Sequence, residues 1–170
     1  MEKTTIVVDF ERTKKHCSDN EFSAKEVQRV LLTGEFRHSV DAKNRIFIPA
    51  KMREELGETF MVVLDLHERC LQIHSMQGWE EYIAPIKQLP RAEQAVVMRM
   101  LHSSAAVVTP DSQGRVLLPA QLIRESGIEK NAVILGCEAY AEIWPEAVYE
   151  EKFGSPDYAS ISEMLRGYGL

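Results

Sequence analysis

The chain has 170 residues, of which 45% are hydrophobic and 27% are charged, and its formal net charge at pH 7 is −6. This composition is typical of a globular protein of one domain or two small ones. No run approaches the roughly 20 apolar residues of a membrane span, and the N-terminal residues do not resemble a secretory signal. The three cysteines (Cys17, Cys70 and Cys137) are widely spaced, which favours reduced thiols in a cytoplasmic protein.

Residues 1–31 form an N-terminal extension without clear periodicity, expected to be a flexible arm or a short helix. Residues 32–84 follow as a first structural unit. Within it we expect strands at 35–40 and 45–48 around a charged turn. A short helix is expected from Ala50 to Leu56, with Gly57 closing it in the left-handed conformation. The apolar run 60–66 and the alternating stretch 71–74 predict two further strands. Ser75 is expected to cap a helix that Pro85 ends.

Residues 85–103 are interpreted as a linker that contains a helix, and residues 104–153 as a second unit. Strands are expected at 105–108, 116–118, 132–135 and 141–144, with a short helix that starts at Pro119. The tail, residues 154–170, contains Gly, Ser and Pro and is expected to be loose, with at most a helical turn at 161–165.

The second unit repeats the first. Residues 33–57 read TGEFRHSVDAKNRIFIPAKMREELG, and residues 104–127 read SAAVVTPDSQGRVLLPAQLIRESG. Aligned residues keep a constant offset, so that Asp41 corresponds to Asp111 and Arg45 to Arg115. Each half is close to the lower size limit for independent folding. We therefore expect an α+β fold in which two β-rich repeats share one core as a pseudo-two-fold β-barrel with short flanking helices.

The repeated turn places an aspartate and an arginine four residues apart. Asp41 and Asp111 are predicted to stabilise the turns by accepting hydrogen bonds from turn amides and by pairing with the arginines. Arg45 and Arg115 can point the guanidinium fork at a phosphate or at guanine, so we predict that they bind DNA. Lys43 at the loop apex is a predicted phosphate contact, and its counterpart is Gln113.

Arg37, just before the first turn, is a further predicted contact to the DNA backbone. Lys51 and Arg53 on the short helix are weaker candidates, because pairing within the helix, such as Lys51 with Glu55, is the competing interpretation. Since the second copy has Gln113 and Val107 where the first has Lys43 and Arg37, the first turn is expected to carry more of the DNA contact.

The overall negative charge argues against a nucleic-acid partner, but the charge is unevenly distributed. Residues 37–53 contain five lysines and arginines against one aspartate, whereas residues 125–163 contain nine carboxylates against two lysines. A basic face can bind phosphates while an acidic face keeps the protein in solution.

No catalytic or metal site is predicted. The five histidines lack metal-ligand spacing, and the sequence implies no catalytic base for Cys70 or for Ser103 and Ser104. Trp79, Tyr82, Trp144 and Tyr149 occupy similar places in the two copies, which favours packing over base stacking. We therefore predict a protein without enzymatic activity, cofactor or metal.

The doubled D-x-x-x-R motif and its flanking stretches resemble those of the MraZ family of bacterial transcriptional regulators. The linking helix and the segment EIW at residues 142–144 add to this resemblance. The similarity covers about residues 32–153. The resemblance implies two AbrB-like swapped-hairpin repeats that form one barrel. It also implies a homo-oligomeric ring, commonly an octamer or dodecamer, that binds promoter direct repeats in the division and cell-wall gene cluster. Arg45 and Arg115 would then contact double-stranded DNA, with Lys43 and Arg37 as neighbours, in a cytoplasmic, nucleoid-associated protein.

Members of that family usually begin near the residue equivalent to Leu32. Residues 1–31 are therefore either an extension that modulates oligomerisation or a product of a misassigned start, which intact-mass spectrometry would distinguish. The alternative function is a non-catalytic scaffolding oligomer that binds protein partners. The operator sequence, the ring size and the choice between repression and activation do not follow from the sequence.

Overall fold

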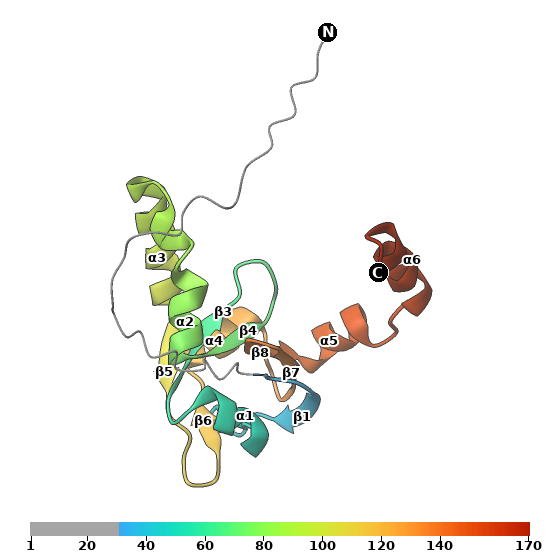
Figure 1. The fold of residues 1–170 in the computed structure, drawn as a ribbon. Coiled ribbons are helices and arrows are strands. Elements are labelled where there is room, and N and C mark those ends of the chain that lie inside the picture. Colours follow the sequence, from blue (N-terminus) through green and yellow to red (C-terminus); the bar gives the residue numbers. More distant parts are fainter. Residues whose placement is uncertain (1–30) are drawn as a thin grey trace, which may run out of the picture.

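The computed structural model describes residues 31–170, and the predictions for residues 1–30 lie outside this range. The described part has an α+β fold that combines a six-stranded antiparallel sheet, a two-stranded ribbon and six α-helices (Figure 1). None of these helices has the length and apolar character needed to cross a membrane.

The elements repeat in order along the chain. The first copy comprises β1 (Glu35–Ser39), β2 (Arg45–Phe47), α1 (Ala50–Leu56), β3 (Phe60–Leu64), β4 (Leu71–Ser75) and α2 (Met76–Ile83). A 3₁₀ turn, η1 (Ile86–Gln88), and α3 (Arg91–Ser103) lead to the second copy. The second copy comprises β5 (Ala105–Val108), β6 (Arg115–Leu117), α4 (Ala120–Ser126), β7 (Asn131–Cys137), β8 (Tyr140–Pro145) and α5 (Glu146–Phe153). The last element is α6 (Tyr158–Gly167).

Local chemistry sets the helix boundaries. Pro49 and Pro119 precede α1 and α4, where a missing N–H has no cost. Ser75 Oγ accepts a hydrogen bond of 3.0 Å from the amide of Gly78, which confirms its predicted capping role. Gly127 ends α4 in the left-handed conformation, whereas Gly57 after α1 combines φ 89° with an extended ψ of −172°. The prediction of a left-handed closure at Gly57 is therefore wrong in ψ.

The C-terminal tail is not loose. It forms the ten-residue helix α6, because Asp157 accepts hydrogen bonds of 3.1 Å from the amides of Ala159 and Ser160 and so caps a segment with helical apolar spacing. No side chain of α6 is buried among the described residues.

The two copies exchange their first strands. The order of the large sheet is β1-β7-β8-β4-β3-β5, with Phe36 of β1 opposite Ile134 of β7 and Ala106 of β5 opposite Val62 of β3. β1 and β5 are the two edges of this sheet, and β2 and β6 leave it to pair with each other. The expected barrel is therefore not closed, because the strands that would complete it form a separate ribbon.

One core serves both copies. Its fully buried members come from both halves of the chain and include Ile46, Ile48, Phe60, Ile73, Val116, Leu118, Ile134 and Ile143. Two smaller clusters lie on the opposite face of the large sheet from this core. One buries Trp79 in the first copy, and the other buries Trp144 and Tyr149 in the second copy. The prediction that these aromatic residues pack rather than bind bases agrees with their burial.

A network of hydrogen-bonded polar side chains runs along β4 next to the aromatic residues. His74 is 3% exposed, donates its Nε2 proton to Gln72 Oε1 at 3.0 Å, and lies 4.8 Å from the ring of Tyr82 and 5.4 Å from that of Tyr140. Gln72 in turn donates to Asp65. Burial lowers the pKa of His74 to about 4, because the charged imidazolium loses its hydration.

This burial predicts an acid-dependent loss of stability. An unfolded histidine titrates near pH 6.5, so the unfolded chain binds more protons than the folded chain between about pH 6.5 and 4. We expect the free energy of unfolding to fall by on the order of 3 kcal/mol as pH decreases through this window. Urea titrations followed by tryptophan fluorescence at several pH values would measure the decrease. His74→Phe, which keeps a stacked ring, should lower stability at neutral pH but flatten the dependence. An unchanged slope in this variant would refute the assignment.

Candidate nucleic-acid interface

The β2–β6 ribbon brings the two repeated motifs together. Ile46 pairs with Val116 at its centre, and both side chains are fully buried in the core. Because side chains alternate along a strand, the neighbouring residues point to the opposite face. That outward face, called here the ribbon face, carries two arginines and two apolar residues: Arg45, Phe47, Arg115 and Leu117.

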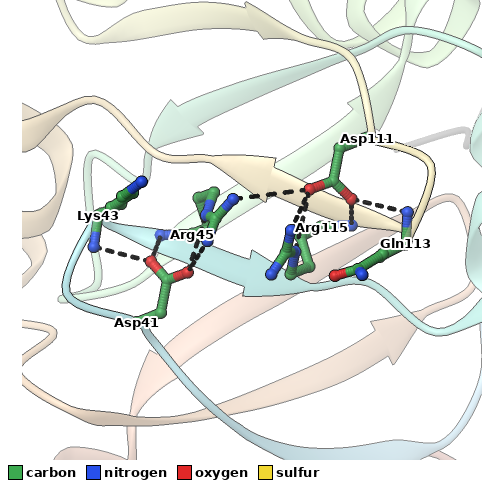
Figure 2. A network of polar contacts seen from close by, with 6 residues as sticks. All are labelled: Asp41, Lys43, Arg45, Asp111, Gln113 and Arg115. Atoms are coloured by element: carbon green, nitrogen blue, oxygen red, sulfur yellow. Dashed lines mark hydrogen bonds and ion pairs between the residues drawn. The ribbon is translucent and has the colours of Figure 1, made fainter.

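The first turn is organised by the two carboxylate oxygens of Asp41. Oδ1 accepts hydrogen bonds from the amides of Lys43 (2.8 Å) and Arg45 (2.9 Å). Oδ2 accepts from Arg45 Nε at 2.8 Å and lies 2.7 Å from Nη2. One oxygen therefore holds the backbone turn and the other orients the arginine (Figure 2). Asn44 adopts φ 59°, the positive value that a tight turn needs.

The second turn repeats this arrangement. Asp111 Oδ1 accepts from the amides of Gln113 (2.9 Å) and Arg115 (3.0 Å), and Oδ2 accepts from Arg115 Nε (2.9 Å) and Nη2 (2.8 Å). Gly114 takes the positive φ, at 77°. The sequence repeat is thus a repeat of side-chain geometry as well.

The two motifs are in contact across the ribbon. Figure 2 shows Arg45 extending toward the second turn, and its Nη1 lies 3.9 Å from Asp111 Oδ2. Both guanidinium groups use Nε and Nη2 to bind their own aspartate. Since a guanidinium has five N–H groups, each arginine keeps donors for a further acceptor. About 30% of each side chain remains exposed, 29% for Arg45 and 31% for Arg115.

The aspartates stay ionised to low pH. Hydrogen bonds from the arginine side chain are the main cause and those from the turn amides add to it, so that the pKa values of Asp41 and Asp111 are lowered to about 2. The folded-state pKa is thus below the ordinary value near 4. The carboxylate–arginine pairing is complete above that value and is lost as pH falls toward 2.

The other predicted contacts lie in different surroundings. The ammonium of Lys43 points away from Asp41 at the exposed apex of its turn (Figure 2). Arg37 lies among carboxylates, with Nη2 2.9 Å from Glu35, and Nη1 2.6 Å from Glu150 and 3.4 Å from Glu146. These contacts link β1 to α5 and raise the pKa of Arg37, mainly through the hydrogen bond with Glu150. Arg37 therefore does not join the Asp41–Arg45 cluster.

One basic residue is nearer the second turn than its sequence position suggests. Arg53 of α1 donates from Nε to the carbonyl of Ile48 at 3.0 Å and lies against Gly114. An open groove of about 590 Å³ next to it runs between α1 and residues 109–111. The signal in the sequence is a break in the repeat, because the position equivalent to Arg53 is Ile123.

Among residues 31–170, no group of three His, Cys, Asp or Glu side chains is arranged to hold a metal ion. The chemistry that the ribbon face offers is hydrogen bonding and charge. Two pre-oriented arginines with remaining donors suit an anionic partner.

Comparisons with known proteins agree with the resemblance seen in the sequence. A family model described as "MraZ protein, putative antitoxin-like" matches residues 31–99 and 101–162. Several similar proteins are named transcriptional regulator MraZ. That of a Thermoanaerobacter species is 37% identical over 139 residues, which cover 79% of this chain and 96% of the relative.

Two further relatives with the same name show similar coverage. The Heliobacterium modesticaldum protein is 36% identical over 145 residues, covering 82% of this chain and 100% of the relative. The Alkaliphilus oremlandii protein is 39% identical over 136 residues, covering 79% and 94%. With a family model that matches both copies and relatives that align over nearly their whole length, the chain belongs to the MraZ family.

Proposed function

We propose that this protein is a DNA-binding transcriptional regulator of the bacterial division and cell-wall gene cluster, and that the ribbon face is its DNA-binding surface. The carrying observation is the pairing of β2 with β6, which places Arg45 and Arg115 on one exposed surface with donors remaining. The relatives' printed name, transcriptional regulator, supports the same class of function.

The geometry suits a nucleic acid in two ways. Arginine oriented by a carboxylate presents its remaining N–H groups in a fixed direction, so little side-chain entropy is lost when a phosphate or guanine accepts from them. Lys43 at the turn apex adds a phosphate contact. Arg37 stays a candidate for the DNA backbone, but its three glutamate neighbours reduce the charge that it can offer.

We also propose that the two copies form one AbrB-like swapped-hairpin unit. The exchange of β1 and β5 between copies, together with the β2–β6 ribbon, supports this topology. In the proposed assembly, copies of the chain form an octameric or dodecameric ring in the cytoplasm, associated with the nucleoid. The ring would engage promoter direct repeats without enzymatic activity or a cofactor.

Charge reversal on the ribbon face should abolish DNA binding. In the double variant Arg45→Glu/Arg115→Glu, carboxylates replace both oriented donors and repel phosphate. We expect no shift of DNA from the region upstream of the protein's own operon, measured by fluorescence anisotropy and gel shift at several salt concentrations. Loss of single contacts, as in Arg45→Ala, should cost about tenfold in affinity and reduce the salt slope by about 1.

The matched control, Arg91→Glu/Arg99→Glu, makes the same charge change at two exposed residues of α3. It should bind like the wild type, and native mass spectrometry should show one oligomeric state for all variants. Normal binding by the double variant would exclude the ribbon face as the reader. Absence of any DNA binding by the wild-type protein would favour the scaffolding function instead.

Binding should depend on tandem sites if a ring presents several ribbon faces together. The second and later contacts are then intramolecular, and the local concentration raises the apparent affinity by about 10² or more. We expect DNA with several direct repeats to bind at least that much more tightly than DNA with one repeat of equal length. Equal affinities would contradict the proposed multivalent binding.

The two oxygens of Asp41 allow turn stability and arginine orientation to be separated. Asp41→Asn keeps an oxygen for the amides of Lys43 and Arg45 but turns an amide donor toward the guanidinium. We expect nearly unchanged thermal unfolding with weaker DNA binding. Asp41→Ala removes both functions and should also lower the unfolding temperature. Calorimetry and anisotropy measure the two effects. If Asp41→Asn binds DNA normally, the carboxylate serves only the turn.

A further inference from the structure

Arg53 makes a contact between the two copies that has no counterpart at the equivalent position, Ile123. It belongs to α1 of the first copy, yet a Cβ built on Gly114 of the second turn would lie 2.8 Å from its Cζ and 2.9 Å from its Nε and Nη2. Its guanidinium thus packs directly on the backbone of the second turn. Its Cζ also lies 6.0 Å from the ring centre of Phe47 on the ribbon face.

Arg53 also forms a hydrogen bond with Ile48, the residue whose amide binds the second turn. The amide of Ile48 donates to the carbonyl of Gly114 at 3.0 Å, and the carbonyl of Ile48 accepts from Arg53 Nε at 3.0 Å. Arg53, Ile48 and Gly114 therefore form a closed set of contacts at the start of α1. Gly114 directly precedes Arg115, so movement of the turn would move that arginine.

The first turn has only half of this arrangement. The amide of Leu118 donates to the carbonyl of Asn44 at 2.9 Å, which corresponds to the bond from Ile48 to Gly114. The residue equivalent to Arg53 is Ile123, whose side chain has no donor. The difference between Asn44 and Gly114 fits this asymmetry. Asparagine tolerates the positive φ of the turn, but only glycine leaves room for the guanidinium.

We propose that Arg53 is a positioning residue for DNA recognition, which orients Arg115 by clamping the second turn from the other copy. This proposal rests on the function proposed above and extends it. It also changes the expected ranking of the two turns. The second turn lacks a lysine at its apex, but a guanidinium from α1 holds it in place, so its arginine is the better oriented of the two.

The competing role for Arg53 is direct contact with a phosphate, and two substitutions separate the roles. Arg53→Gln removes the charge, but glutamine Nε2 is as far along the side chain as arginine Nε and can donate to Ile48. Arg53→Lys keeps the charge but has no donor at that position and no planar group against Gly114. A positioning role predicts a smaller loss of DNA affinity for Arg53→Gln, which keeps the bond to Ile48 and a planar group, than for Arg53→Lys. The reverse order would overturn the proposal in favour of a phosphate contact.

A double-mutant cycle tests which turn Arg53 serves. Arg53→Ala should weaken binding to the upstream operon DNA by about fivefold in the wild-type and Arg45→Ala backgrounds, and by less than about twofold in the Arg115→Ala background. Equal losses in all three backgrounds, or no loss in any, would overturn the proposal. Arg124→Ala is the control, because it removes an exposed arginine from α4, the equivalent helix of the other copy. If Arg115→Ala itself binds normally, the proposed DNA-binding surface is wrong, and not only the role of Arg53.

Glycine replacement gives a second test that leaves Arg53 in the sequence. Gly114→Asn displaces the guanidinium from the turn, whereas Asn44→Gly in the other copy displaces nothing. We expect Gly114→Asn to match Arg53→Ala in DNA affinity and in faster hydrogen exchange of the Arg115 amide, with little effect of Asn44→Gly on affinity. Wild-type affinity and exchange in Gly114→Asn would refute the clamp. Thermal unfolding of each variant establishes that the fold is retained.

Discussion

The antiparallel pairing of β2 with β6 is the contact on which the rest of the molecule depends. Each strand has only three residues, yet its central side chain, Ile46 or Val116, is fully buried in the core. The backbone bonds from Ile48 to Gly114 and from Leu118 to Asn44 extend this pairing to both turns. The same short ribbon therefore closes the core on one face and places two arginines on the other.

Exchange of strands explains why the chain contains two copies rather than one. β1 pairs with β7, and β5 pairs with β3, so the first strand of each copy obtains its backbone hydrogen bonds from the other copy. The apolar side chains of both copies also share one core. Each half therefore completes the sheet and the core of the other, and the two turns flank the β2–β6 ribbon that both halves share.

The arginines of the chain have two kinds of carboxylate partner. At the turns, one aspartate orients one arginine and leaves donors for another acceptor. At β1, three glutamates surround Arg37 and join the sheet to α5, with Tyr149 donating to Glu35 beside them. Equal formal charges thus serve different purposes, because the number of carboxylates around each guanidinium decides what it can still bind.

The sequence alone determined the repeat, the identity and order of most elements, the aspartate–arginine motif and the family. These features depend on neighbouring residues: strand and helix periods, proline and glycine at element ends, and a spacing of four across a turn. The helix α6 was missed because the Gly, Ser and Pro around residue 155 obscured the capping aspartate, Asp157. Closure of the barrel was wrongly expected because duplication indicates shared packing but not which strands pair.

Only the tertiary structure decided which charged residues gather at one site. In the structure, Arg45 Nη1 lies 3.9 Å from Asp111 Oδ2, and Arg37 lies in a cluster of glutamates. Arg53 of one copy packs on Gly114 of the other. Strand pairing or helix placement brings the residues of each contact together. Because the two copies exchange strands, the residue beside an arginine of the first copy can belong to the second copy. The sequence determined what each turn is made of, and long-range pairing determined what lies beside it.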